Sequence, residues 1–361
     1  MNKLEEARES INEIDKEMAD LFTRRMKAVG IVAEYKKQRG LQITDSSREE
    51  AVVERNSAYI TDESLKEYYV KFLRNNFEVS KSYQHRLLDG MRVAYTGVEG
   101  AFANIAAKKI FPDATAVSCR DFKSAYDSVV KGTCDVAVLP VENSYNGDVG
   151  QVMDLAFFGN LYITGIYDIS VVQNLLGVEG ATIDDIRTVI SHEQALGQCE
   201  DYIHEHGFEA VPVVNTAVAA KQVAEKGDKS IAAIASDEAA KIYGLKKLEA
   251  HINGSANNTT RFAVFSRVPT ERKSDGQFIM LFTVNNEAGS LGKAISVIGD
   301  YGYNLRALKS RPSKDLIWSY YFYAEGEGNI NSENGENMLE ELSECCNQVR
   351  IVGSFDREIA L

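Results

Sequence analysis

The sequence predicts a multidomain protein: an all-α segment, then a two-lobed α/β domain, then a small α+β domain. Three observations predict this order. The first 111 residues contain no proline and the first 89 contain only Gly30 and Gly40, which favours long uninterrupted helices. From Met91, short β-branched runs alternate with helical stretches. After a polar linker, the pattern becomes βαββαβ. We therefore expect domains at 1–89, 91–268 and 276–361.

Composition excludes several classes of protein. The formal net charge of −13 disfavours nucleic-acid or anionic-membrane partners. Apolar runs are far shorter than the ~20 residues of a membrane span, and the charged N-terminus lacks the apolar core of a signal peptide. We expect a cytoplasmic protein. Its five cysteines have no metal-ligand spacing, and the five histidines are scattered, so we expect free thiols and no metal.

The first helix follows from the apolar residues that recur from Leu4 to Tyr35 at a helical period without a breaker. A helix of ~35 residues is ~50 Å long, too long to bury its stripe against one small chain. It implies helical partners and a homo-oligomer, a dimer or higher. A second helix should open at 45–49, where Ser46 and Glu49 form a capping-box pattern. A third should run from Thr61 or Asp62 to about residue 88.

Cations on the first helix are spaced to bind a small anion. Arg25 and Lys36 are eleven residues apart, which places them on one face ~16 Å apart. Arg8 is ~25 Å from Arg25 on a different face, so it could serve only the site of an antiparallel partner. The alternative is that these are solvated surface charges.

In length, helix pattern and polar positions, residues 1–89 resemble the all-helical chorismate mutase family. That resemblance implies a Claisen rearrangement of chorismate to prephenate, in which the protein folds a dianion into a reactive chair and stabilises charge on the ether oxygen. Arginines would hold the carboxylates. Lys36 and Gln84 would donate to the ether oxygen, and Asp45 and Glu49 would orient the hydroxyl, although Glu49 could also be a capping residue. The implied site residues are Arg8 of a partner chain, Arg25, Lys36, Asp45, Arg48, Glu49, Ser80 and Gln84.

The second segment shows a βα alternation with mostly parallel strands in two lobes around a cleft. Ligands in such sheets bind at the carboxyl ends of strands. We expect strands at 91–96, 114–118, 135–139, 161–176, 188–190, 210–214, 231–235 and 262–266, and helices at 101–110, 122–130, 148–157, 195–205 and 216–224.

Three polar loops lie where a ligand is expected, at 140–144, 191–196 and 257–262. Together they resemble prephenate dehydratase, which converts prephenate to phenylpyruvate; Thr-Arg-Phe at 260–262 is the most specific motif. Ala103, Asn104 and Glu193 depart from the family pattern. His192 is interpreted as packed or hydrogen-bonded. The implied pocket comprises Asn143, Ser144, Ser191, Gln198, Thr259, Thr260 and Arg261.

The reaction limits the role of each group. Loss of carbon dioxide and of a hydroxyl yields an aromatic ring, so the enzyme must chiefly help the hydroxyl leave as water. The resemblance makes Thr260 the catalytic hydroxyl, which polarises the leaving oxygen or relays a proton. The identity of the proton donor stays open. Arg261 would hold either the pyruvyl carboxylate or a structural partner.

The third segment should contain strands at 278–284, 305–310, 317–323 and 349–352, helices at 290–301 and 333–346, and a mobile loop at 327–335. This order is ferredoxin-like and resembles the ACT regulatory domain, which binds amino acids. Ser290 and Lys309 replace the usual alanine and glutamate, which could weaken or retune phenylalanine binding. A dimerising module without regulation is the alternative. The implied effector contacts are Ala288, Gly289, Ser290, Leu291, Ser310, Arg311 and Pro312.

Together these resemblances imply a bifunctional chorismate mutase/prephenate dehydratase with an ACT domain, controlled by L-phenylalanine, an enzyme that needs no cofactor. Two alternatives stay open: a dehydratase that prefers arogenate, and a non-catalytic small-molecule sensor.

Overall fold

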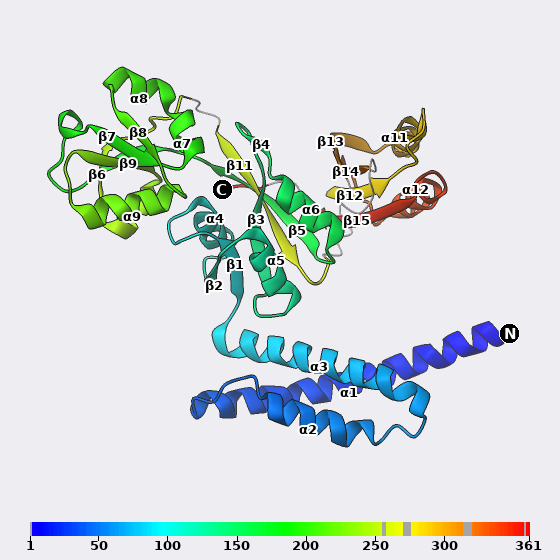
Figure 1. Ribbon diagram of the computed structural model, residues 1–361. Helices are drawn as coiled ribbons and strands as arrows, with labels where there is room; N and C mark the ends of the chain where they lie inside the picture. Colours follow the sequence, from blue (N-terminus) through cyan, green and yellow to red (C-terminus); the bar gives the residue numbers. More distant parts are fainter. Residues whose placement is uncertain (1, 255–257, 270–275, 313–319, 357–358) are drawn as a thin grey trace. The chain divides into compact units, whose positions relative to one another are not determined.

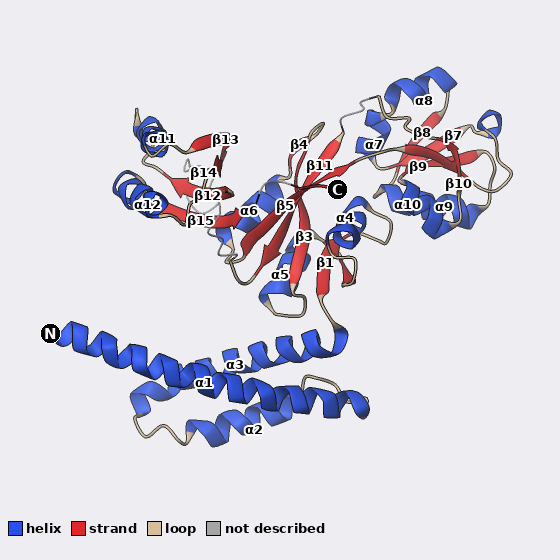
Figure 2. Cartoon of the chain, turned by 180° about the vertical axis from the view of Figure 1, so that it is seen from behind, coloured by secondary structure: helices blue, strands red, loops and turns tan. Residues whose placement is uncertain are grey.

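The computed structural model describes residues 2–254, 258–269, 276–312, 320–356 and 359–361. Its contacts divide the chain into two compact units. The first is Met1–Arg92 with Lys131–Asp135, and the second comprises the rest. Figures 1 and 2 show the elements of both units.

The first unit is entirely helical apart from its ends and connections, as predicted. Its helices are α1 (Lys3–Gln38), α2 (Ser46–Ser57) and α3 (Glu63–Asp89). Asp62 caps α3 by accepting from the Ser64 N–H. The predicted Ser46–Glu49 capping box is wrong, because Asp45 is the residue that caps α2, through the Arg48 N–H.

Helix α1 keeps most of its apolar stripe exposed within this chain. Its N-terminal part projects beyond α2 and α3 (Figure 1). Of its residues only Ala33 is buried. Exposure is 43–57% for a row of apolar side chains: Leu4, Ile11, Ile14, Met18, Leu21 and Phe22.

The second unit contains the two lobes that were predicted (Figure 1). The sheet of the first lobe has the order β5-β11-β3-β1-β2, with β4 beside β3. Its elements are β1 (Arg92–Thr96), α4 (Phe102–Ile110), β2 (Thr115–Cys119), α5 (Phe122–Val130), β3 (Val136–Asn143), β4 (Gly147–Asp148), α6 (Gly150–Phe158), β5 (Tyr162–Ser170) and β11 (Thr259–Ser266).

The second lobe is a sheet in the order β10-β6-β9-β7-β8 with an apolar core on each face. Helix α8 lies on one side and α9 on the other (Figure 1). Its elements are β6 (Asn174–Gly177), a 3-10 turn (Ile183–Asp185), β7 (Thr188–Ser191), α7 (Glu193–Gln198), α8 (Glu200–His206), β8 (Glu209–Pro212), α9 (Thr216–Lys226), β9 (Ile231–Ala235), α10 (Asp237–Tyr243) and β10 (Lys246–Glu249).

Several sequence predictions for the lobes were wrong. The strands are mixed rather than mostly parallel, because β11 runs antiparallel to β3 and β5, and β6 runs antiparallel to β9 and β10. The strand at 161–176 is two strands in different lobes. The helix at 195–205 is two helices that meet at Cys199. Helix α10 and strand β10 were not predicted.

The last part of the chain has the predicted βαββαβ order, with sheet order β13-β14-β12-β15 as in ferredoxin-like folds. Ile317, the expected start of its third strand, is outside the described residues. The loop predicted to be mobile is short, and Ile330 within it is buried in the core. The elements are β12 (Gln277–Thr283), α11 (Ser290–Asp300), β13 (Asn304–Pro312), β14 (Tyr320–Glu327), α12 (Glu333–Cys345), β15 (Gln348–Phe355) and β16 (Ile359–Ala360).

This module is continuous with the first lobe. Strand β15 pairs in parallel with β5 through Gly353 and Ile163, so that the described strands of both form one sheet. Strand β16 pairs with the other end of β5.

Candidate active sites

In the helical unit, three of the predicted residues meet between α1 and α3. The Arg25 guanidinium donates to the Ser80 hydroxyl at 2.5 Å, and Gln84 donates to the Ser80 carbonyl oxygen at 3.3 Å. Ser80 and Gln84 are 5% and 6% exposed. The Gln84 Oε1 atom is buried without a hydrogen-bond partner among the described residues. A buried unpaired amide oxygen costs about 1–3 kcal/mol, which indicates a place for a ligand.

A second group lies where α1 approaches the start of α2. Lys36 donates to the Ile43 carbonyl oxygen at 2.6 Å. The Arg48 N–H and Ser47 hydroxyl lower the pKa of the Asp45 carboxyl, and the charges of Lys36 and Arg48 add to this effect. Asp45 is therefore an ionised helix cap at its position beside Lys36 and Arg48.

Glu49 forms an ion pair with Lys81 at 3.3 Å. Sequence reasoning missed Lys81, which follows Ser80 on α3. Arg8 lies on the exposed N-terminal part of α1, and at seventeen residues from Arg25 it is ~25 Å away along the helix. One chain therefore does not bring Arg8 to the other predicted residues.

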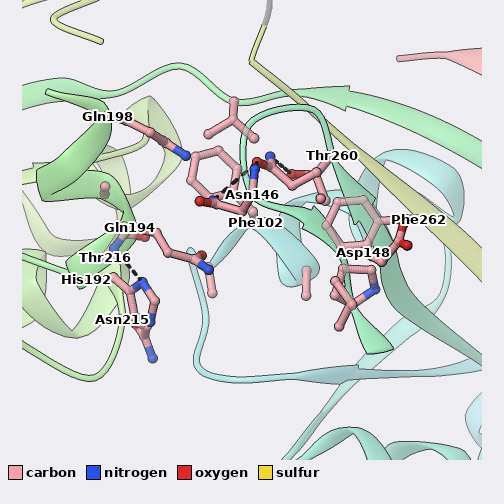
Figure 3. A pocket seen from close by; sticks show the side chains of 18 of the residues that line it. Phe102, Asn146, Asp148, His192, Gln194, Gln198, Asn215, Thr216, Thr260 and Phe262 are labelled. Atoms are coloured by element: carbon pink, nitrogen blue, oxygen red, sulfur yellow. Dashed lines mark hydrogen bonds between the residues drawn. The ribbon is translucent and has the colours of Figure 1, made fainter. Parts of the chain in front are cut away.

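The two lobes of the second unit enclose a cavity of about 570 Å³ (Figure 3), a volume typical of small-molecule sites. Three of the residues expected in the pocket, Thr260, Asn143 and Gln198, line this cavity, and so does His192. The other lining residues are Ala101, Phe102, Ala103, Phe122, Pro140, Asn146, Gly147, Asp148, Val149, Gly150, Gln151, Val171, Gln173, Gln194, Ala195, Asn215, Thr216 and Phe262.

Asn143 fixes the position of the Thr260 hydroxyl. Its side-chain amide donates to Thr260 Oγ1 at 2.9 Å and to Asn258 Oδ1 at 2.9 Å. Its Oδ1 accepts from the Tyr145 and Asn146 N–H groups at 3.0 Å, so the turn after β3 holds the amide. A hydroxyl that accepts through one lone pair can still donate its own hydrogen. The Thr260 hydroxyl is thus supplied with a donor and remains available as a donor.

The cavity can hold an anion without a cationic side chain. Its described lining contains neither lysine nor arginine. Instead, the first turns of α4, α6, α7 and α9 line it, through Phe102, Gly150, Gln194 and Thr216. Helices α4 and α6 have no side-chain cap, so their first N–H groups are left for a ligand. Helix N-termini carry positive partial charge and bind carboxylates and phosphates.

Four predicted pocket residues do not line the cavity. Ser191 is fully buried and donates to the Ile234 carbonyl oxygen at 2.6 Å, so it joins β7 to β9. Ser144 accepts from the Thr259 N–H at 3.0 Å. Ser144 and Thr259 therefore tie the β3–β4 turn to β11, and neither lines the cavity.

Arg261 also points away from the cavity. It makes a bidentate pair with Glu325 at 3.1 and 3.2 Å, a contact with Glu142 at 3.1 Å and one with Asp168 at 3.8 Å. Of its two predicted roles, the structure therefore favours the structural partner. Burial raises the pKa of the Asp168 carboxyl, and Arg261 offsets part of that increase.

Comparison with known proteins identifies the family. Residues 93–270 match the prephenate dehydratase family model, and residues 7–85 match that of chorismate mutase type II. The bifunctional chorismate mutase/prephenate dehydratase of Neisseria gonorrhoeae is 30% identical over 96% of this chain and 95% of its own. The chain belongs to the bifunctional chorismate mutase/prephenate dehydratase family.

Two further relatives match about three quarters of the chain. An arogenate dehydratase/prephenate dehydratase of Arabidopsis thaliana is 36% identical over 276 residues, 73% of this chain and 72% of its own. The crystal structure of a prephenate dehydratase from Arthrobacter aurescens in complex with L-Phe is 26% identical, with a TM-score of 0.68. That match covers 74% of this chain and 90% of the other.

Within this family context, the expected effector residues lie at two places in the C-terminal module. Gly289 caps α11 in the left-handed conformation (φ 89°), between Ala288 and Ser290–Leu291. Ser310, Arg311 and Pro312 lie in β13, which extends two residues beyond its predicted end. Arg311 Nε donates to Asp154 on α6 at 3.1 Å and is thus directed toward the dehydratase lobe.

Sequence reasoning missed several cavity residues, among them Gln173 on a lobe connection and Asn215 and Thr216 in the second lobe. Gln173 follows β5, is 2% exposed, and has no partner at Oε1 among the described residues. Asn215 caps α9 by accepting from the Val218 N–H, and Thr216 begins that helix. The Asn-Thr pair after a strand is an N-cap signal that could have been used.

No helix among the described residues is both long and apolar enough to span a bilayer.

Proposed function

We propose that the cavity between the lobes dehydrates and decarboxylates prephenate with Thr260 as the donor to the departing hydroxyl. The hydrogen bond from Asn143 to Thr260 Oγ1, at 2.9 Å, is the observation that carries this proposal. It leaves the Thr260 hydrogen to point at the substrate oxygen. The carboxylates of the dianion would lie at the helix N-termini.

The reaction breaks two bonds of prephenate and consumes one proton. The C–C bond to the ring carboxylate breaks and its electron pair enters the ring, while the C–O bond breaks and the hydroxyl leaves as water after taking up a proton. Thr260 is too weak an acid to be the source of that proton, so it polarises the oxygen or relays the proton. The ring becomes aromatic, which drives the reaction.

For the helical unit we propose that the buried group around Gln84 binds chorismate. Arg25 would hold a carboxylate and Lys36 and Gln84 would donate to the ether oxygen. Two observations support a ligand here: Ser80 and Gln84 are buried, and Gln84 Oε1 has no hydrogen-bond partner among the described residues. Donation to the ether oxygen requires Gln84 Nε2 to exchange its bond to the Ser80 carbonyl oxygen for one to the substrate. Membership in the bifunctional family gives the chain both activities, and the sensor alternative is not favoured.

Two variants test whether the mutase and dehydratase activities belong to separate sites, and each variant is the control for the other. Thr260→Val keeps the side-chain shape and removes the hydroxyl, so purified protein fed chorismate should accumulate prephenate. Gln84→Leu should leave chorismate unchanged but still convert added prephenate to phenylpyruvate. Phenylpyruvate formation at the wild-type rate by Thr260→Val would contradict the proposed role of Thr260.

We further propose that the chain works as an oligomer in which α1 of one protomer completes the mutase site of another with its Arg8. The exposed apolar row on α1 and the distance of Arg8 from Arg25 support this. Arg8→Ala and Gln84→Leu should each lack mutase activity. Mixed dimers contain one intact site, so mixing should restore up to about a quarter of wild-type activity. No recovery after mixing under exchange conditions would refute the shared site.

Finally, we propose that the C-terminal βαββαβ module is an ACT domain that binds L-phenylalanine and feeds back on the dehydratase. The relative crystallised with L-Phe supports the ligand, and the continuous sheet with the first lobe supports coupling. Inhibition requires that phenylalanine bind two conformations unequally. Calorimetric titration with phenylalanine, alongside prephenate turnover, tests this; binding without any change in turnover would contradict feedback.

A further inference from the structure

A cation from the C-terminal module reaches the wall of the dehydratase cavity. Lys309, on β13, places Nζ 2.5 Å from Asp148 Oδ1 and 3.0 Å from Glu142 Oε1. Its side chain is only 20% exposed. Glu142 and Asp148 are directly opposite each other in the β3–β4 pair. Without Lys309, like charges would therefore face each other across this ladder.

Asp148 is the one carboxylate among the described residues that line the cavity. It stands in β4 next to Val149 and Gly150, which form the uncapped start of α6. The remaining lining is apolar, amide or hydroxyl apart from His192. The charge that a substrate meets on this wall therefore depends on whether Asp148 is neutralised.

The two substrate classes of such enzymes differ in charge. Prephenate carries two carboxylates and a ketone, for a net charge of −2. Arogenate carries an ammonium group in place of the ketone, for a net charge of −1. An unpaired carboxylate at the wall would repel prephenate more strongly, and it would also give the ammonium group an acceptor.

We propose that Lys309 is a specificity-determining residue that favours prephenate over arogenate by neutralising Asp148. This inference rests on the proposed dehydratase function of the cavity and names its substrate class. Lys309 acts on the substrate only through Asp148, whose charge it neutralises, and does not itself contact the substrate.

The test is to measure kcat/KM for prephenate and for arogenate in the same preparations of wild type and Lys309→Met. The ratio of prephenate to arogenate should fall about tenfold in the variant, the effect of one uncompensated charge at short range in a partly buried site. The matched control is Lys247→Met. It removes the same charge from another ion pair in the same unit, with Asp237 at 2.6 Å and away from this cavity. Its ratio should not change.

A second variant separates charge from folding. In Lys309→Met combined with Asp148→Asn, the cavity charge is again neutral and Glu142 keeps its contact with Arg261 at 3.1 Å. The ratio should return to the wild-type value even if both rates fall, and thermal melting of each variant shows whether it is folded. An unchanged ratio in Lys309→Met, or no recovery in the double variant, would overturn the inference. Wild-type protein that converts neither substrate would instead overturn the proposed function.

Discussion

Removing Arg261 should destabilise the second unit strongly. Its guanidinium, 18% exposed, pairs with Glu325 at 3.1 and 3.2 Å while contacting Glu142 and Asp168. In Arg261→Met, at least one carboxylate stays buried without a cation, which costs about 3–5 kcal/mol. Since the site is not fully buried, the expected loss in the free energy of unfolding is about 3 kcal/mol.

The matched control is Arg74→Met in the helical unit. Arg74 makes a bidentate pair with Glu50 at 3.0 and 3.2 Å, but both side chains are more than half exposed. Its removal should cost less than about 1 kcal/mol. Unfolding in urea would be followed by amide hydrogen exchange, which reports on α1–α3 and on the strands of the second unit separately. Equal losses for both variants would refute the argument from burial.

The stability of Arg261→Met should depend on pH in a characteristic way. Burial raises the pKa of Asp168, and loss of Arg261 would raise it further above the unfolded value. A carboxyl whose pKa is raised on folding destabilises the protein at high pH and ceases to do so as pH falls through its folded pKa. The stability difference between wild type and Arg261→Met should therefore shrink as pH falls from neutral through the raised folded pKa of Asp168. A difference that stays constant over this range would contradict the electrostatic explanation.

Two further predictions concern stability. The Ser124 hydroxyl and N–H, with Arg120, lower the pKa of Asp121 to about 2. The Asp121 carboxylate therefore stabilises the fold above its unfolded pKa of about 4, and this stabilisation is lost as pH falls toward 2. Asp121→Asn should flatten that part of the acid unfolding curve, and an unchanged curve would contradict this. Gly335→Ala would place Cβ 2.1 Å from the Ile330 carbonyl oxygen and should lower the free energy of unfolding by about 2 kcal/mol. Gly299→Ala, on α11 with no atom near the added Cβ, should instead raise the free energy of unfolding by about 0.5 kcal/mol. Chemical unfolding of both variants tests this difference.

The helices of the first unit could be predicted because the apolar periodicity of the sequence is unambiguous there. The apolar period from Leu4 to Tyr35 has no competing breaker, and Asp62 is a favourable cap. Asp45 and Ser46 are both good caps, so the sequence could not choose between them; the backbone places Asp45 at the non-helical position.

The strand predicted at 135–139 extends to Asn143 in the structure, so four residues assigned to a polar loop belong to β3. In the structure Pro140 stays in β3 opposite Phe262, where a register shift between Arg261 and Phe262 accommodates it. Proline is tolerated at such bulges. As a result Asn143 and Thr260 lie in neighbouring strands and become cross-strand partners.

The cavity itself could be predicted only in part. Its chemistry was visible in Asn143, Gln198 and Thr260, but its walls depend on tertiary contacts. Ser191 stands at a strand end, as expected of a ligand residue, yet its side chain is fully buried and donates to the Ile234 carbonyl oxygen of the neighbouring strand β9. No local pattern indicates that Lys309 would reach β4, 161 positions earlier in the chain.

The parallel pairing of β15 with β5 has a consequence for truncation. Gly353 sits directly against Ile163, with space for no side chain, since an added Cβ would lie 2.6 Å from the Ile163 carbonyl oxygen. A shortened chain that ends before β12 would leave one side of β5 without its neighbour, and open strand edges template self-association. Shortened forms of this chain should therefore tend to aggregate, and loss of turnover in them would not measure loss of regulation.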